Sequence, residues 1–233
     1  MARAARAARG NGAATANQIK VTARAQMAAH GTAGLSLRGI ARAMAITAPA
    51  IYNYFPSLDD LITALIIDAF TSLAEATEAA EAAVRKQPPF DRIMAICLAY
   101  RHWAISHPTD FLLIYGNPIP GYQAPEELTI PLARRPFLGL FHLFASTFET
   151  GTLQIPPSYQ DLPGEMSTAI AAWKRSSAIE MPDALVVLLM SGWARVHGTI
   201  MLEMFHHLQP LVGDGEAFFV HEVTAFAAQL GVQ

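Results

Sequence analysis

The stretch from Ser36 to Leu61, SLRGIARAMAITAPAIYNYFPSLDDL, predicts two short capped helices separated by a tight turn. Ser36 and Thr47 suit the two helix starts, because a hydroxyl oxygen there can accept a hydrogen bond from an N–H group that the helix leaves without a partner. Pro49 fits a first helical turn, where its missing N–H costs nothing. Two short helices joined by a turn of about four residues form the helix-turn-helix geometry, whose second helix enters the major groove of DNA.

The residues around this stretch predict a third helix and a long fourth one. Asn17 can cap a helix that ends at Gly31, and its apolar positions recur at intervals of four. Ser57 can cap a long helix that continues to about Lys86. We therefore expect a DNA-binding domain over residues 17–65 and a separate domain over 66–233. Residues 1–16, which are rich in Ala and Arg, are expected to form a flexible arm.

The second short helix leaves a set of small and polar residues on its open side. Methyl groups of Ala48 and Ala50 can contact thymine methyl groups, and Asn53 can hydrogen-bond a base edge. Hydroxyl groups near the helix start suit phosphate oxygens. The candidate DNA-binding residues are Ser36, Arg38, Thr47, Ala48, Pro49, Ala50, Tyr52, Asn53 and Tyr54.

Charge is distributed unevenly along the 233 residues. Residues 1–60 contain seven Lys or Arg against two Asp, whereas the remainder carries nine basic and seventeen acidic residues. Only the first segment therefore suits a polyanionic partner. Arg3, Arg6 and Arg9 could reach phosphates or a minor groove, although a solvated tail without a partner is the alternative.

Composition excludes several classes of protein. With 52% apolar and 15% charged residues, the chain can bury enough apolar surface to fold. The most apolar stretches, 61–70 and 184–202, are interrupted by Asp68, Arg195 and His197, so no membrane span is expected. A single cysteine excludes an internal disulfide framework and a multi-cysteine zinc site. We expect a cytoplasmic protein without cofactor or metal.

Further helices are predicted throughout the second domain, and no segment shows the sustained alternation of a strand. The fold class is therefore all-α. The predicted helices cover residues 90–106, 109–115, 132–150, 165–179, 183–208 and 215–230.

The helix-turn-helix stretch resembles the N-terminal domain of the TetR family of transcriptional regulators. Matching elements include Ile46-Thr47, Ile51-Tyr52 and Tyr54-Phe55, and they follow the family's spacing without a gap. The sequence departs from the family pattern at two positions, with Ala45 where the turn usually has Gly and Leu58 where a phosphate-binding Lys is common. Ala45 must either keep a negative φ or accept left-handed strain.

The segment Trp193–Gly198 resembles the W-x-x-x-H-G signature of one class of TetR C-terminal domains. The resemblance implies a homodimer held by a four-helix bundle, formed by the last two helices of each subunit. It also implies a repressor whose release from an inverted-repeat operator is triggered by a small effector, with the fourth helix linking the effector cavity to the DNA-binding domain. The candidate dimer residues are Met204, Leu208, Phe219, Val223 and Phe226.

The resemblance implies an effector cavity, and aromatic residues in the central helices could line it for an apolar or amphipathic molecule; ordinary core packing is the alternative for each of them. The candidate ligand-binding residues are Trp103, Phe111, Phe141, Trp193 and His197. The alternative is a helical ligand-binding or metal-dependent enzyme, since Glu203 and His206 form a Glu-x-x-His unit like those of bundle di-metal sites. Such a site needs a second unit, and the sequence has none.

Overall fold

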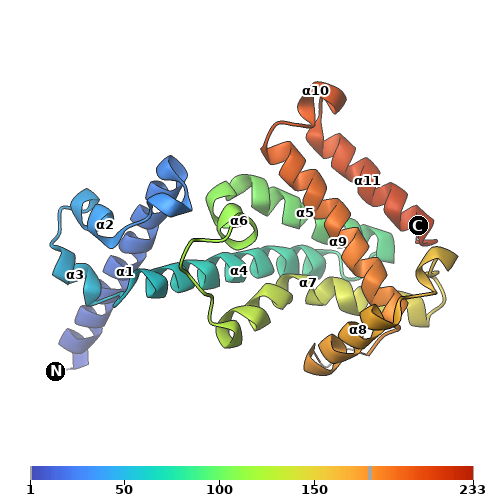
Figure 1. Cartoon of the computed structure of the whole chain (residues 1–233), viewed down its shortest axis with the longest axis horizontal. Coiled ribbons are helices and arrows are strands. Elements are labelled where there is room, and N and C mark those ends of the chain that lie inside the picture. The colour runs from blue at the N-terminus through green and yellow to red at the C-terminus, as the bar shows by residue number, and fades with distance from the viewer. Residues whose placement is uncertain (1, 178–179, 233) are drawn as a thin grey trace. The chain divides into compact units, whose positions relative to one another are not determined.

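The computed structural model describes residues 2–177 and 180–232, with side chains described from residue 12 and not at 176–177 (Figure 1). All regular structure in these described residues is helical, which confirms the all-α class. The elements are α1 (Ala2–His30), η1 (Thr32–Gly34), α2 (Leu37–Ala43), α3 (Ala48–Tyr52), α4 (Leu58–Ala83), α5 (Pro89–Ser106), α6 (Pro108–Tyr115), α7 (Glu126–Glu149), η2 (Pro157–Tyr159), α8 (Gly164–Ser177), α9 (Asp183–Met204), α10 (Gln209–Val212) and α11 (Gly215–Gln229).

The first compact unit comprises Met1–Ser72 and His107–Ala133. Ile19, Ile40 and Ile51 are fully buried in its core and come from α1, α2 and α3, as the apolar spacing predicts. Ser57 caps α4, because its Oγ accepts a hydrogen bond from the Asp60 N–H at 3.1 Å and donates one to Asp60 Oδ2 at 2.7 Å. α6 also packs against α1, so residues 107–133 belong to this unit and not to the other.

The second compact unit comprises Leu73–Ser106 and Arg134–Gln233, with α5, α9 and α11 in mutual contact. Arg101 of α5 is buried and donates hydrogen bonds to both carboxylate oxygens of Glu203 on α9, at 2.8 and 2.6 Å. The Arg101 guanidinium also lies over the Phe219 ring of α11, 5.9 Å from its centroid. The Arg101 side chain of α5 thus contacts both α9 and α11, the other two helices around the core of this unit.

α9 is the one helix in the described part of the chain that is long and apolar enough to cross a membrane by length and composition. Its most apolar 18-residue window has a mean hydropathy of 1.5. Within this unit α9 packs against α5, α8 and α11. A core helix of a soluble bundle passes the same test, so α9 does not indicate a membrane protein.

Three helix limits differ from the sequence prediction. Asn17 caps no helix, because α1 already begins at Ala2 and includes it; the Ala-rich segment before it has high helix propensity. α7 begins at Glu126 and not near residue 132. The predicted helix over 183–208 ends at Met204, and His206 follows with a φ of 59° that a continuous right-handed helix does not allow.

Candidate functional site

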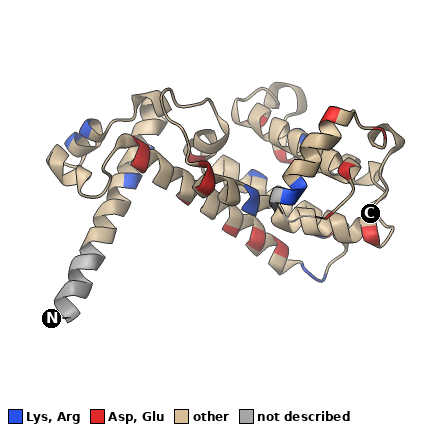
Figure 2. Ribbon diagram, turned by 60° about the horizontal axis from the view of Figure 1, so that its bottom comes forward, with Lys and Arg blue, Asp and Glu red and all other residues tan. Residues whose placement is uncertain are grey.

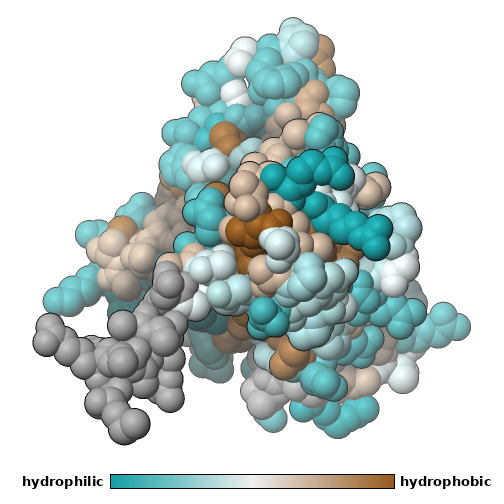
Figure 3. Space-filling view, turned by 90° about the vertical axis from the view of Figure 1, so that its left-hand side faces the viewer, coloured by the Kyte–Doolittle hydropathy of each residue, from teal (hydrophilic) through white to brown (hydrophobic). Residues whose placement is uncertain are grey.

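The predicted contact residues of α2 and α3 lie at the surface of the first unit. Ile51 anchors the inner side of α3 and is fully buried, whereas the neighbouring Tyr52 is 46% exposed. Asn53 and Tyr54 follow and are exposed. Figure 3 views this end of the molecule, and its surface is largely hydrophilic with small hydrophobic areas. Of the remaining candidates, Ser36, Arg38, Thr47 and Pro49 are exposed, and Ala48 and Ala50 are half-buried.

The two predicted helix caps differ in the structure. Ser36 caps α2, because its Oγ accepts a hydrogen bond from the Gly39 N–H at 3.1 Å. Thr47 occupies the N-cap position of α3 with extended backbone, but its side chain accepts no hydrogen bond from the N–H groups of that helix. The expected side-chain cap is therefore wrong for Thr47, whose exposed hydroxyl is not used in capping.

The turn between α2 and α3 depends on Ala45, which adopts a φ of 54°. Its neighbour Ile46 donates a backbone hydrogen bond to the carbonyl oxygen of Ala41 at 3.0 Å, which closes the turn at the end of α2. Of the two alternatives that the sequence left open, the structure shows the left-handed one. A residue with a Cβ atom pays roughly 1 kcal/mol to adopt the left-handed conformation. The turn that orients α3 is therefore strained at Ala45.

Not all of the positive charge in the first unit is available to a polyanion. Lys20 forms an ion pair with Asp68 at 2.6 Å, and Arg24 hydrogen-bonds Asp110. The basic side chains of α2, Arg38 and Arg42, are exposed. Figure 2 colours the Lys and Arg residues blue along the ribbon. The side chains of Arg3, Arg6 and Arg9 lie outside the described residues.

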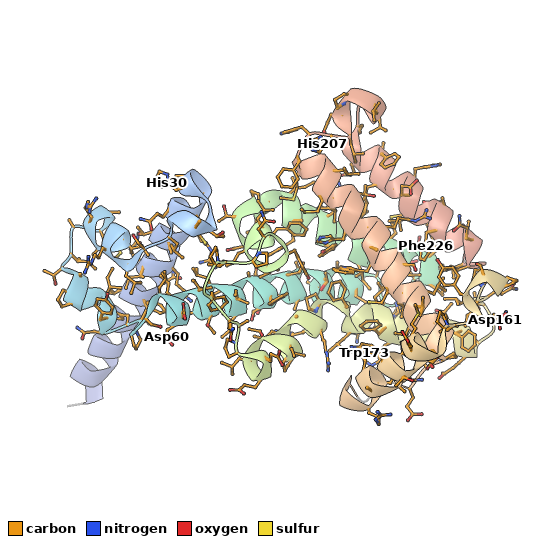
Figure 4. The ribbon with its side chains drawn as sticks, viewed as in Figure 1. His30, Asp60, Asp161, Trp173, His207 and Phe226 are labelled. Carbon is orange, nitrogen blue, oxygen red and sulfur yellow. The ribbon has the colours of Figure 1, made fainter. Side chains whose placement is uncertain are left out.

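An apolar cavity of about 50 Å³ lies within the second unit, between α5, α7, α9 and α11. Its wall includes the rings of Tyr100, Phe137 and Trp193, together with Phe226, which is labelled on α11 in Figure 4. Gly192 on α9 also lines it, and a Cβ at that position would come within 2.7 Å of the Phe226 ring. The α9–α11 contact is therefore close because residue 192 has no side chain.

His197 lies next to this cavity. Its Nδ1 is 2.8 Å from the Tyr100 hydroxyl, and its ring centroid is 5.0 Å from that of Trp193. Burial lowers the pKa of His197 below its usual range, so the ring is neutral at pH 7. In the W-x-x-x-H-G segment, the neutral His197 ring thus lies against Tyr100 and Trp193, two of the aromatic residues that line the cavity.

Comparison with known proteins identifies both parts of the chain. The family described as "Bacterial regulatory proteins, tetR family" matches residues 19–65, and "Tetracyclin repressor-like, C-terminal domain" matches residues 93–226. The chain belongs to the TetR family. It is 35% identical over 182 residues to the HTH-type transcriptional regulator Rv1816 of Mycobacterium tuberculosis and to Mb1846 of Mycobacterium bovis, covering 78% of this chain and 77% of each relative.

Solved structures agree with this assignment. The crystal structure of SCO4313, a regulatory protein by name, superposes with a TM-score of 0.76 at 27% identity, covering 94% of this chain and 98% of that one. The TetR family transcriptional regulator PfmR from Thermus thermophilus shares the fold, with a TM-score of 0.61 at 16% identity over 89% of this chain and 96% of that one. The protein is thus a DNA-binding transcriptional regulator of the TetR family and not an enzyme.

In this TetR-family regulator, four of the five predicted ligand-binding residues do not line the apolar cavity: Trp193 does, and His197 lies behind the wall, hydrogen-bonded to Tyr100. Phe111 belongs to the first unit, where its ring packs 5.3 Å from that of Tyr115. Phe141 packs against Trp173 of α8, which Figure 4 labels, with ring centroids 5.6 Å apart. Trp103 is buried and is not one of the residues that line the cavity. Spacing along a helix identifies an apolar face, but it does not say which neighbour covers each residue.

The predicted dimer residues of this TetR-family regulator also need correction. Phe219, Val223 and Leu208 are buried inside a single chain, and Met204 and Phe226 are half-buried. A second chain cannot reach the buried three. α9 instead exposes a different stripe, in which Met190 and Leu202 are 43% and 47% exposed and Ala194 lies between them.

The Glu-x-x-His unit that suggested a metal site has another role. Both carboxylate oxygens of Glu203 accept hydrogen bonds from Arg101, and His206 lies beyond the end of α9 in an exposed position. The Glu203 carboxylate thus forms a structural ion pair with Arg101. Among the described residues, no group of three or more His, Cys, Asp or Glu side chains could hold a metal ion.

Proposed function

We propose that this protein is a cytoplasmic, homodimeric repressor that binds an inverted-repeat operator and is released by a small effector. The observation that carries this proposal is the exposed outer face of α3, with Tyr52 and Asn53 presented by a helix whose inner side is locked by Ile51. An α-helix held in this way fits the major groove.

The exposed stripe of α9 supports the homodimer. Only 33% of the most apolar window of this helix is buried within one chain, and Met190, Ala194 and Leu202 recur on one side at multiples of four residues. A two-fold axis would place the same stripe of a second copy against it, because an isologous interface uses one patch on both subunits. Small residues such as Ala194 and Gly198 would allow the two helices to approach closely.

The effector proposal rests on the apolar cavity and the aromatic rings that line it. Its walls exclude a multiply charged ligand, because an unpaired buried charge is costly. Release of DNA requires that the effector favour the DNA-incompetent state, with a typical coupling of about 1 to 3 kcal/mol. α4 is the candidate link, since it supplies residues to both compact units.

Genomic DNA selection with the purified full-length protein tests the proposal. Bound fragments should share an inverted repeat, with half-site centres about one helical turn or a multiple of it apart. Footprinting should show protection on one face of the duplex, and binding should weaken steeply as salt is raised. Recovery of fragments without a common dyad, or binding that is insensitive to salt, would contradict operator recognition.

A further inference from the structure

A second, polar cavity lies in the same unit as the apolar one. It has a volume of about 320 Å³ and is lined by α4, the segment after it, the start of α5, and α7. Its charged residues are Glu78, Glu81, Arg85, Arg92 and Arg135. Neither the family match nor the apolar cavity accounts for three arginines gathered at this place.

The two cavities share part of their walls. Thr77 of α4, Ile96 of α5 and Pro136 of α7 line both. The hydroxyl of Thr77 donates its hydrogen to nearby backbone carbonyl oxygens, among them that of Pro136 at 3.2 Å, so it presents no strong polar group to a passing chain. The apolar cavity and the polar cavity are therefore adjacent, and this shared wall separates them.

The carboxylates of the polar cavity are already occupied. Glu81 Oε2 accepts from Arg85 and Glu81 Oε1 accepts from Arg92. Both oxygens of Glu78 accept from Arg135, at 2.7 Å each. Although burial raises the pKa of Glu81, hydrogen bonds from the two arginines outweigh that effect and lower its pKa, so Glu81 remains ionised. A cationic ligand would have to compete with these arginines.

The group of the polar cavity that still lacks a hydrogen-bond partner is a donor. Arg92 Nε is buried and has no hydrogen-bond partner among the described residues, although the side chain as a whole is 25% exposed. A buried N–H without an acceptor is unfavourable, and an acceptor from a ligand would remove that penalty. Guanidinium groups favour carboxylates, because their N–H groups match the two oxygens.

We propose that the effector is an amphipathic monocarboxylate, whose carboxylate binds at Arg92 in the polar cavity and whose apolar tail displaces the shared wall at Ile96 so that its end enters the apolar cavity. This inference rests on the proposed effector function and specifies the chemistry of its ligand. The tail reaches Phe137 and Trp193, while the single negative charge stays where arginines and solvent can compensate it. An alcohol of equal length offers Arg92 one neutral acceptor and no charge, and a protonated amine offers no acceptor at all.

Three probes with the same eight-carbon chain test the inference: octanoate, octan-1-ol and octylamine. Binding to the full-length protein is measured by calorimetry and by the change in tryptophan fluorescence, because Trp193 lines the apolar cavity. We expect octanoate to bind at least about tenfold more tightly than either of the other probes. Equal or tighter binding of octan-1-ol or octylamine, or no octanoate binding up to about 1 mM, overturns the proposal.

Variants separate the carboxylate site from the tail site. Arg92→Gln should weaken octanoate binding about tenfold and leave octan-1-ol within about twofold. Because Arg92→Gln leaves Glu81 with one fewer partner, the Glu81→Gln/Arg92→Gln pair provides a charge-balanced test with the same expected loss. Ile96→Trp should weaken both probes, and Arg175→Gln, at an exposed position of α8, should change neither. Unchanged octanoate affinity in both Arg92 variants overturns the assignment.

DNA binding is measured separately from ligand binding. Failure to recover an operator would contradict the proposed function, whatever the octanoate titration shows. Failure to discriminate between the three probes, with operator binding intact, would overturn only the carboxylate site.

Discussion

Arg24 of α1 and Asp110 of α6, 86 residues apart, form a two-oxygen hydrogen bond: Arg24 Nε lies 2.8 Å from Oδ1 and 3.0 Å from Oδ2 of the carboxylate. The Asp110 side chain is only 11% exposed, and it stands in the first turn of α6, where the helix dipole also favours a negative charge. This pair attaches α6 to the first helix of the DNA-binding domain.

We expect Arg24→Gln and Asp110→Asn each to lower the free energy of unfolding by about 1 to 3 kcal/mol, because each removes one charge of a partly buried, hydrogen-bonded ion pair. The double variant should lose less than the sum of the two. Urea unfolding of the four proteins measures the coupling. Lys20→Gln, which removes a more exposed ion pair with Asp68, should cost less than about 1 kcal/mol. Additive losses would show that the Arg24–Asp110 contact contributes nothing of its own.

Replacing Ala45 by glycine should stabilise the protein. The φ of 54° strains an alanine and suits a glycine, so Ala45→Gly should raise the free energy of unfolding by up to about 0.5 kcal/mol after the added entropy of the unfolded chain is deducted. The control is Ala79→Gly, at an exposed position inside α4, which should cost about 1 kcal/mol. Destabilisation by both changes would argue against strain at the turn.

Substitutions on the outer face of α3 should separate affinity from specificity. Tyr52→Phe is expected to weaken operator binding by about 1 to 2 kcal/mol through loss of a phosphate hydrogen bond. Asn53→Ala should relax the preference at one base position and leave the other positions unchanged. Titration of selected and single-base-variant operators measures both effects, with Tyr159→Phe in the second unit as the control. If neither variant alters binding, α3 is not the recognition helix.

A charge in the exposed stripe of α9 should separate the subunits. Ala194→Glu places an uncompensated carboxylate between Met190 and Leu202, so sedimentation at micromolar concentration should detect monomers, and operator binding should be lost with them. The matched control is Ala172→Glu on the exposed side of α8, which should remain dimeric. A wild-type monomer at the same concentration would contradict the homodimer.

His197 should make stability depend on pH. Burial lowers its pKa in the folded protein, so below the ordinary value of about 6.5 the unfolded chain binds a proton that the folded chain does not. The free energy of unfolding should therefore fall as pH decreases from 7 to 5, and His197→Gln should show a shallower decrease. Urea unfolding at several pH values measures this difference, and equal slopes for the two proteins would refute it.

Local sequence determined the DNA-binding helices and the fold class. Ser36, Ser57 and the buried residues Ile40 and Ile51 act over one or two helical turns, so their spacing and caps can be read from consecutive residues. The same reasoning identified Tyr52 and Asn53 as outward-facing. It left the φ of Ala45 open, because both conformations complete a turn of that length.

Tertiary structure alone decided which apolar residues face a cavity, a core or a partner. Phe137 and Phe141 stand one helical turn apart on α7, yet the first lines the apolar cavity and the second packs on Trp173. Phe219 is apolar like Leu202, but only Leu202 is exposed. The polar cavity joins Glu78 to Arg135, 57 residues away. Helical periodicity specifies a face within one element, whereas the partner of that face is set by long-range packing, which no local pattern encodes.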